Sequence, residues 1–483
     1  MSAHPPPPHA LPQFHPMTVL RRWTQQGDEF RILDAVCGVA CLGATGSGKT
    51  SGPARHLAIA YLAAEFGGIV LCAKPEERKQ WQEWAELTER SHDLVIIDAS
   101  NKNRFNFLDW ESSQAGVGGG LTINVVAMLE EIISGLTPPD KQGGGDDGGF
   151  WEDALHQLLI NTVELMQLAR KPLDLSAMRD IVRSAPQSRR ESEDPDWQAR
   201  SICWKRLTEA EAATRDGDKE ARPDYEECQA YWLEDFAALS EKTRSIIVLM
   251  FTKLAQPFTA RPLRKIFSTD TTIRPEDTFR GKVIIVDLSC QEFRMAGRIA
   301  AIVLKFCWQM AVMRRPQPAP GTYLRPSFCW ADEAAENFIS RSDPAFQAVA
   351  RSAAGCTVYL GQNINQYRRR LGSNDAFESF MGNLQTKFFC QNTGDTNEWA
   401  AKLLGQRWTE FQGSGSSYGA SGGSASTSTS WQRAYLVEPN AFTTLRRGGA
   451  PNGYTVDTYV YKGGHIFYAN GQSFLLLPIE QLG

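Results

Sequence analysis

Short runs of apolar residues alternate with longer amphipathic segments along most of the chain. Between the runs, apolar residues recur at helical spacing, as in 53–66, 76–88 and 296–315. Strands that alternate with helices predict a mainly parallel sheet with crossover helices, which is the α/β fold class. The runs that predict buried strands lie at 32–42, 67–74, 92–100, 281–289, 325–332, 356–362 and 385–392.

The middle of the chain has a different pattern. Between about Gly149 and Phe258 apolar residues recur at helical spacing, and no segment there has the character of a strand. The glycine-rich stretch DKQGGGDDGG, Asp140 to Gly149, is typical of a linker. We therefore predict an all-α insertion at 147–258 that separates two α/β parts, 21–146 and 259–483.

Both ends of the chain have distinctive composition. Residues 1–20 begin with a proline-rich stretch, which predicts a flexible tail without a signal peptide. Near the other end, Gly413 to Ser430 is rich in glycine and serine, and we expect a disordered surface excursion rather than a mobile loop with a function. The last apolar runs, 454–464, 465–471 and 473–478, predict a small β end-piece.

Composition narrows the protein class. A chain of 483 residues with a net charge of −4 predicts more than one domain and excludes a uniformly basic nucleic-acid-binding protein. Ten cysteines occur without a C-x-x-C pair and seven histidines are dispersed, so we expect free thiols in a reducing compartment and no zinc site. No apolar stretch approaches the length that a membrane-spanning helix needs.

A phosphate-binding motif follows the first predicted strand. The segment GATGSGKT, Gly43 to Thr50, matches G-x-x-x-x-G-K-[ST] in full. Its glycines let backbone N–H groups surround phosphate oxygens, and a helix that begins near Gly48 adds the positive end of its dipole. The pattern predicts that Lys49 reaches the β- and γ-phosphates of ATP and that Thr50 holds Mg²⁺. The expected nucleotide-binding residues are Gly43, Thr45, Gly46, Ser47, Gly48, Lys49, Thr50 and Ser51. The parts 21–146 and 259–483 are then two halves of one nucleotide-binding domain.

Hydrolysis requires a carboxylate at the end of a neighbouring strand, and the chain offers two candidates. Asp287 ends the run VIIVD, and Asp332 ends SFCWAD with Glu333 directly after it. We favour the adjacent pair, with Asp332 at the metal and Glu333 orienting or deprotonating the attacking water. Gln362 ends the next run, CTVYLGQ, where its amide can sense the γ-phosphate.

The order of these motifs resembles the type IV coupling-protein ATPases of conjugation and secretion, the TraG/TraD-like branch of the HerA/FtsK translocases. GATGSGKT resembles the family's Walker A, WADEAAEN its Walker B, and ARSAAGCTVYLGQNINQ its motif III. LCAKPEE, FNFL and YLVEPNAFTTLRRGG resemble three further family segments. The resemblance implies a RecA-like P-loop domain and identifies the insertion with the family's all-α domain.

Two departures qualify the resemblance. Family members usually begin with transmembrane helices, and the second-strand motif here has lost an aspartate and a glycine but keeps Lys74. The resemblance also implies a ring in which an arginine acts on the neighbour's ATP. Arg351 is the matching position, and the alternative, a solvated helix residue, stays open.

The resemblance implies an ATPase motor with ATP and Mg²⁺ as cofactors. We expect a cytoplasmic homo-hexamer, recruited to the inner membrane face by a partner protein, that couples DNA or a relaxase–DNA complex to a type IV secretion machine. The alternatives are a soluble HerA/FtsK-like translocase on single- or double-stranded DNA, a protein-substrate coupling ATPase, and a scaffold that binds ATP without turnover. Intact Lys49, Asp332 and Glu333 argue against the scaffold.

Overall fold

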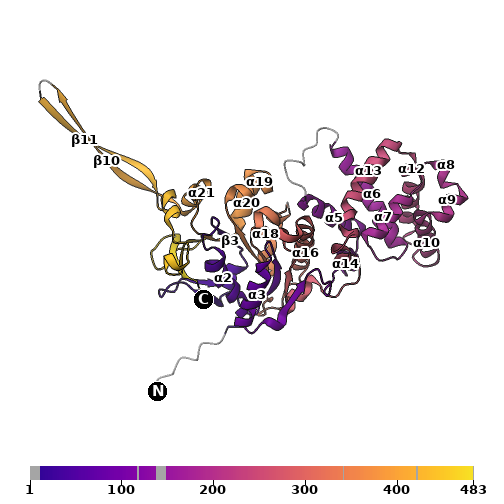
Figure 1. The fold of residues 1–483 in the computed structure, drawn as a ribbon, viewed down its shortest axis with the longest axis horizontal. Coiled ribbons are helices and arrows are strands. Elements are labelled where there is room, and N and C mark those ends of the chain that lie inside the picture. The colour runs from indigo at the N-terminus through magenta and orange to yellow at the C-terminus, as the bar shows by residue number, and fades with distance from the viewer. Residues whose placement is uncertain (1–10, 117–118, 137–147, 341, 420–421, 482–483) are drawn as a thin grey trace, which may run out of the picture.

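A nine-stranded sheet forms the centre of the molecule (Figure 1). The computed structural model describes residues 11–116, 119–136, 148–340, 342–419 and 422–481. The strand order is β13-β12-β9-β3-β8-β7-β4-β6-β5. The strands are β3 (Val39–Leu42), β4 (Gly67–Leu71), β5 (Leu94–Ile97), β6 (Val283–Val286), β7 (Ser327–Ala331), β8 (Gly355–Gly361), β9 (Thr386–Phe389), β12 (Thr455–Lys462) and β13 (Phe474–Glu480). The seven strands from β9 to β5 are parallel, which confirms the predicted α/β class.

Strands β3, β4, β6, β7 and β8 are buried on both faces and are therefore mostly apolar, whereas β12 and β13 alternate buried and more exposed positions. In β3, Val39 and Cys41 belong to one core cluster, whereas Ala40 and Leu42 belong to the other. Helices α2 (Arg55–Ala63) and α3 (Glu76–Leu87) contribute to the first cluster. Helices α5 (Thr122–Leu136), α16 (Met295–Met313) and α20 (Asn374–Asn383) contribute to the second. The sheet is therefore enclosed between two layers of helices.

Helix α16 corrects the expectation that no stretch could span a membrane. It is 19 residues long, and by length and composition alone it is apolar enough to cross one. In this fold it is a core helix with most of its side chains buried. Lys305 in its middle is fully buried and pairs with Asp343, and its ammonium group also donates to the carbonyl of Phe338 at 2.6 Å. Its apolar character thus serves the core.

The described residues between α5 and β6 form helices and contain no strand. This helical block extends away from the sheet (Figure 1). Its helices are α6 (Gly148–Leu168), α7 (Leu175–Ser184), α8 (Arg189–Ser192), α9 (Pro195–Arg200), α10 (Ile202–Asp216), α11 (Arg222–Ala230), α12 (Phe236–Ala238), α13 (Glu241–Thr259) and α14 (Leu263–Phe267). The predicted boundary at 258 falls inside α13, and the buried side chains of α14 continue the same core.

The glycine- and serine-rich segment forms a long hairpin rather than the expected disordered excursion. Strands β10 (Gln406–Gly419) and β11 (Gly422–Tyr435) pair in one uninterrupted antiparallel register, from Gln406 opposite Tyr435 outward. In Figure 1 this hairpin projects away from the body on the side opposite the helical block.

Three other expectations change. The run 32–42 is not one strand, because a four-residue helix, α1 (Ile32–Ala35), precedes β3. The C-terminal strands do not form a separate piece, since β12 pairs with β9 and extends the central sheet, and 465–471 is not a strand. Of the predicted tail, residues 1–10 lie outside the described part, whereas Phe14 packs under the Arg325 guanidinium at 4.9 Å. The linker residues 140–147, with the boundary at 146, also lie outside the described residues.

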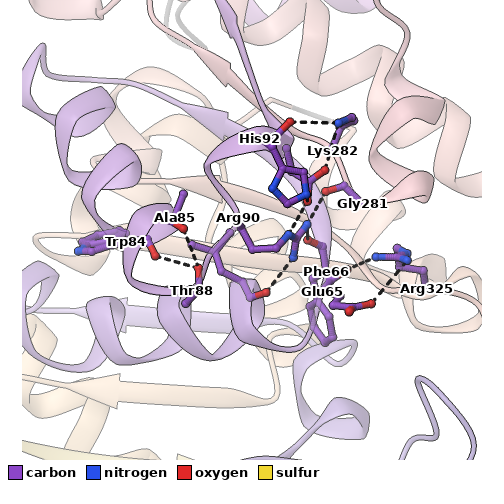
Figure 2. A network of polar contacts seen from close by, with 12 residues as sticks. Glu65, Phe66, Trp84, Ala85, Thr88, Arg90, His92, Gly281, Lys282 and Arg325 are labelled. Atoms are coloured by element: carbon purple, nitrogen blue, oxygen red, sulfur yellow. Dashed lines mark hydrogen bonds and ion pairs between the residues drawn. The ribbon is translucent and has the colours of Figure 1, made fainter.

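A buried arginine connects several elements at the amino edge of the sheet, where the parallel strands begin (Figure 2). Arg90 is buried and donates to the carbonyl oxygens of Leu62 at 2.8 Å, Phe66 at 3.3 Å and Gly281 at 2.6 Å, while its Nε pairs with Asp93 at 2.6 Å. These acceptors lie near the end of α2, before β4 and before β6. The guanidinium therefore satisfies backbone groups of three elements at once.

Candidate nucleotide-binding site

The candidate site lies at the opposite, carboxyl edge of the sheet. Because β8 lies between β3 and β7, the segments after these three strands are brought side by side. The P-loop follows β3, Gln362 follows β8, and the pair Asp332–Glu333 follows β7. A pocket of about 410 Å³ opens there; its walls include Thr45, Gly46, Ser47, Gly48, Lys49, Thr50, Ser51, Lys74 and Glu333.

The P-loop backbone requires its glycines. Gly46 and Gly48 have φ of +73° and +82°, in the left-handed region that favours glycine. A Cβ on Gly48 would also lie 2.5 Å from Val456 of β12, and a Cβ on Gly43 would lie 2.4 Å from the Ser47 hydroxyl. That hydroxyl is buried and lacks a hydrogen-bond partner among the described residues. The loop thus has the shape and an uncommitted polar group for binding an anion.

The helix after the loop begins later than expected. One π-type turn, η1 (Thr50–Ala54), comes first, and it contains a non-helical Gly52 followed by Pro53. Proline has no N–H to donate, which accounts for the kink. Ser51 in this turn accepts a hydrogen bond from Gln481, so it points toward the C-terminal strands as well as lining the pocket.

The structure brings the two predicted magnesium-binding residues together. The Thr50 hydroxyl donates to Asp332 Oδ2 at 2.9 Å, and Asp332 is almost fully buried. Hydroxyl and carboxylate oxygens are ligands that Mg²⁺ prefers. No cluster of three or more histidine, cysteine or acidic side chains suitable for a metal occurs among the described residues. These two oxygens therefore fit Mg²⁺ that is shared with phosphate and water rather than a metal enclosed by protein.

Glu333 lies at the centre of the charged groups. Its Oε1 is 3.7 Å from Lys49 Nζ and 3.3 Å from Lys74 Nζ, and its carboxylate accepts from Gln362 Nε2 at 3.2 and 3.3 Å. The Glu333 backbone has φ of +50°, an uncommon conformation for a residue with a Cβ. Its N–H donates to Asp332 Oδ1 at 2.8 Å. The predicted residues Lys49, Thr50, Asp332, Glu333 and Gln362 therefore converge on one site.

Two other candidates lie elsewhere. Asp287 directly follows β6, which lies beyond β4, and its carboxylate is 2.8 Å from Arg78 Nη1, so it belongs to an ion pair outside the pocket. Burial raises the pKa of Asp287, although Arg78 opposes that shift. Arg351 lies in η6 (Ala350–Ala353), before β8 rather than after it. It is exposed at the amino edge of the sheet, away from its own P-loop.

Sequence reasoning gave no role in the site to two residues, although it noted Lys74 in the second-strand motif. Lys74 follows β4 and reaches Glu333, and Glu77 in the first turn of α3 accepts from the N–H groups of Ala73 and Lys74. Burial, and secondarily the Asp332 carboxylate, raise the pKa of Glu77 to about 8. The sequence signal was the lysine and glutamates after the second strand, but the spacing alone does not show that β4 lies next to β7.

Comparisons with known proteins agree with this architecture. Residues 326–447 match the family model described as the TraM recognition site of TraD and TraG. No curated protein sequence matches the chain. The unbound bacterial conjugative coupling protein TrwBdeltaN70 has the same fold at 15% identity, with a TM-score of 0.58 over 95% of this chain and 88% of that one.

Two further solved structures have this fold. The plasmid coupling protein TrwB in complex with ADP and Mg²⁺ is 14% identical, with a TM-score of 0.59 over 97% of this chain and 90% of that one. VirB4 of Thermoanaerobacter pseudethanolicus is 13% identical, with a TM-score of 0.50 over 96% of each chain. The resemblance to TraG/TraD-like coupling proteins and the RecA-like fold with its mostly parallel sheet are thereby confirmed.

Proposed function

We propose that this protein is an ATP-hydrolysing coupling motor that moves DNA or a relaxase–DNA complex toward a type IV secretion machine. One observation carries the proposal: the P-loop after β3 and the acid pair after β7 meet in one pocket, with Thr50 Oγ1 2.9 Å from Asp332 Oδ2. The match to the TraD and TraG model and the TrwB fold support the coupling-protein class.

The geometry divides the work among the residues. Lys49 is almost fully buried and offers its ammonium group to the phosphates of ATP. Thr50 and Asp332 would hold Mg²⁺, which would neutralise phosphate charge. The Glu333 carboxylate accepts a proton from, or orients, the attacking water, and the Gln362 amide keeps that carboxylate aimed into the pocket.

We propose DNA as the track, because the resemblance is to conjugative coupling proteins. The test measures ATP hydrolysis with single-stranded and double-stranded DNA at several salt concentrations. Stimulation that declines as salt rises is expected, since binding to phosphates releases counterions. Hydrolysis that DNA does not stimulate, in preparations shown to contain rings, would overturn the DNA track and favour a protein substrate.

Two arginine clusters, at 368–370 and 446–447, are the candidate contacts for DNA, and several of their arginines already pair with protein groups. Arg370 donates to the carbonyl of Ile339 at 2.7 Å, Arg369 pairs with Glu336 at 2.9 Å, and Arg446 pairs with Asp457 at 2.8 Å. Arg446 and Arg447 are both exposed, but of the two only Arg446 has an ion-pair partner among the described residues. Arg447→Ala is therefore the variant expected to weaken DNA stimulation, with Arg446→Ala as its neighbouring comparison.

We propose a homo-hexamer in which Arg351 acts on the neighbour's nucleotide. Its exposure at the edge of the sheet opposite its own P-loop supports this role, since it cannot serve the pocket of its own chain. Mixing Arg351→Ala and Glu333→Gln subunits is expected to restore some hydrolysis at hybrid interfaces. Mixed rings without recovery would remove Arg351 from the mechanism.

The proposed location is the cytoplasm, with a partner protein recruiting the motor to the inner membrane face. The apolar helix α16 is buried within the fold, which leaves it unavailable for insertion. The chain expressed alone is expected in the soluble fraction after lysis. Carbonate-resistant membrane association of the lone chain would contradict this location.

A further inference from the structure

Three donors from three different segments converge on one carboxylate in the site. Glu333 Oε1 is 3.3 Å from Lys74 Nζ and 3.7 Å from Lys49 Nζ, while the Gln362 amide reaches both carboxylate oxygens. The catalytic assignment accounts for Lys49 and Gln362, but it gives Lys74 no task. A lysine in contact with both the carboxylate and the phosphate pocket requires its own explanation.

The position of Lys74 is fixed by the start of α3. Its N–H donates to Glu77 Oε1 at 3.1 Å, and the N–H of Ala73 donates to Glu77 Oε2 at 3.3 Å. The backbone is therefore held, while the lysine side chain keeps 45% of its surface exposed. Burial lowers the pKa of the Lys74 ammonium group, but the Asp332 and Glu333 carboxylates outweigh it and raise that pKa overall. The Lys74 backbone is therefore held in place by Glu77, while its half-exposed ammonium group has room to change partners.

Arg78, the next basic residue along the chain, is held differently from Lys74. It lies in the first turn of α3, contacts Asp287 at 2.8 Å and Asp98 at 3.3 Å, and does not line the pocket. Two carboxylates thus hold Arg78 outside the site. Lys74 instead shares a single carboxylate with Lys49 and Gln362, so it has the freedom to exchange that partner for another anion.

We propose that Lys74 is a second phosphate-binding cation, which holds Glu333 and transfers to the terminal phosphate of ATP. This inference rests on the proposed nucleotide function. A terminal phosphate carries more negative charge than a carboxylate, so it competes for both ammonium groups. A lysine suits the exchange because its flexible stem carries a compact charge. Glu333 then keeps the Gln362 amide as its donor and has lone pairs available for water.

The transfer predicts that Lys74 distinguishes ATP from ADP. The test is calorimetric titration with Mg²⁺ and either ADP or a non-hydrolysable ATP analogue. Lys74→Met is expected to weaken binding of the analogue about tenfold, the loss of one charge-assisted contact, and to leave ADP affinity unchanged within about twofold. Lys74→Arg keeps the positive charge and is expected to retain part of the preference for the ATP analogue over ADP. The matched control is Lys79→Met on the exposed side of α3, which should change neither affinity.

A double-mutant cycle gives a second readout. Glu333→Gln removes the competing charge and is expected to tighten binding of the ATP analogue, with a smaller gain in the Lys74→Met background. If Glu333→Gln raised the affinity for the analogue equally in both backgrounds, or if Lys74→Met kept the preference for the analogue over ADP, the role of Lys74 would be overturned. The proposed nucleotide function would not be affected by either result. Failure of the unmodified chain to bind either nucleotide would instead overturn the proposed function, and ADP binding by each variant verifies that its site is folded.

Discussion

The two edges of the central sheet carry similar charged groups in opposite situations. At the amino edge, Arg90 is buried, and its donors meet three carbonyl oxygens and the Asp93 carboxylate, which Lys282 also contacts at 3.1 Å (Figure 2). At the carboxyl edge, one carboxylate, Glu333, is shared by two lysines and a glutamine, and the buried Ser47 hydroxyl has no partner among the described residues.

This difference between the two edges indicates that the amino edge contributes to stability and the carboxyl edge to function. At the amino edge Arg90 is buried outside the pocket and its donors already have acceptors, so a new ligand gains little there and the edge connects elements of the fold. At the carboxyl edge Glu333 lines the pocket and can give up one donor when a stronger anion enters, so this edge can respond to a nucleotide. The comparison predicts that substitutions at the two edges affect different measured quantities.

The largest expected effect is on turnover at the carboxyl edge. Glu333→Gln should lower the rate of ATP hydrolysis by about 100- to 1,000-fold, because the amide cannot accept the proton from the attacking water. The variant should still bind nucleotide, with a tighter hold on the ATP analogue, and its thermal unfolding temperature should be unchanged. The control is Glu336→Gln, which removes an exposed acid one turn later. Substantial hydrolysis by the Glu333 variant would transfer the base to another acid, with Asp287 the first to test.

At the amino edge the expected effect is on stability. Arg90→Ala removes a donor from three backbone carbonyls and leaves Asp93 paired with Lys282, which should lower the free energy of unfolding by about 2–4 kcal/mol. Urea unfolding measures the change. The control Arg280→Ala removes an exposed arginine near the same edge and should cost less than about 1 kcal/mol. If Arg90→Ala altered nucleotide affinity while stability remained unchanged, the separation of the two edges would be wrong.

A smaller effect concerns pH. Burial raises the pKa of Glu77 to about 8, above its value of about 4.5 in the unfolded chain, so the folded state binds more protons between these values. Stability is then fully present below the unfolded pKa and declines as pH rises toward 8, by at most about 1.4 kcal/mol per pH unit. Glu77→Gln should flatten this decline. Unfolding measured from pH 5 to 8 with a chelator present tests it, and identical slopes in both proteins would contradict the shift.

The sequence predicted the site better than it predicted the segments around it. The P-loop and the acids after strands are local patterns, and parallel strands bring such ends to one edge, so Lys49, Thr50, Asp332, Glu333 and Gln362 could be predicted to lie close together. The order of the strands is set by packing between distant parts of the chain. This is why the approach of Lys74 to Glu333 and the burial of Glu77 could not be inferred.

The prediction for the segment that forms the hairpin β10–β11 was wrong for another physical reason. Its glycine and serine content is typical of flexible segments, and that composition outweighed the alternation of small polar residues in its second strand. The pairing of Gln406 with Tyr435 joins residues far apart in sequence, so no local sequence pattern predicts it. The helix at Ile32–Ala35 was missed because a short apolar run does not distinguish one helical turn from a strand.

Binding of Mg²⁺ and ATP by the unmodified chain and by Lys49→Ala tests the central claim most directly. The Lys49 ammonium group is buried at the pocket and has the Glu333 carboxylate within 3.7 Å, so its loss leaves the phosphates without their main cation. Calorimetric titration should show binding by the unmodified chain and an affinity at least about 100-fold weaker in Lys49→Ala, with unfolding temperatures that match. Equal affinities in the two proteins, or no binding by the unmodified chain, would contradict the account.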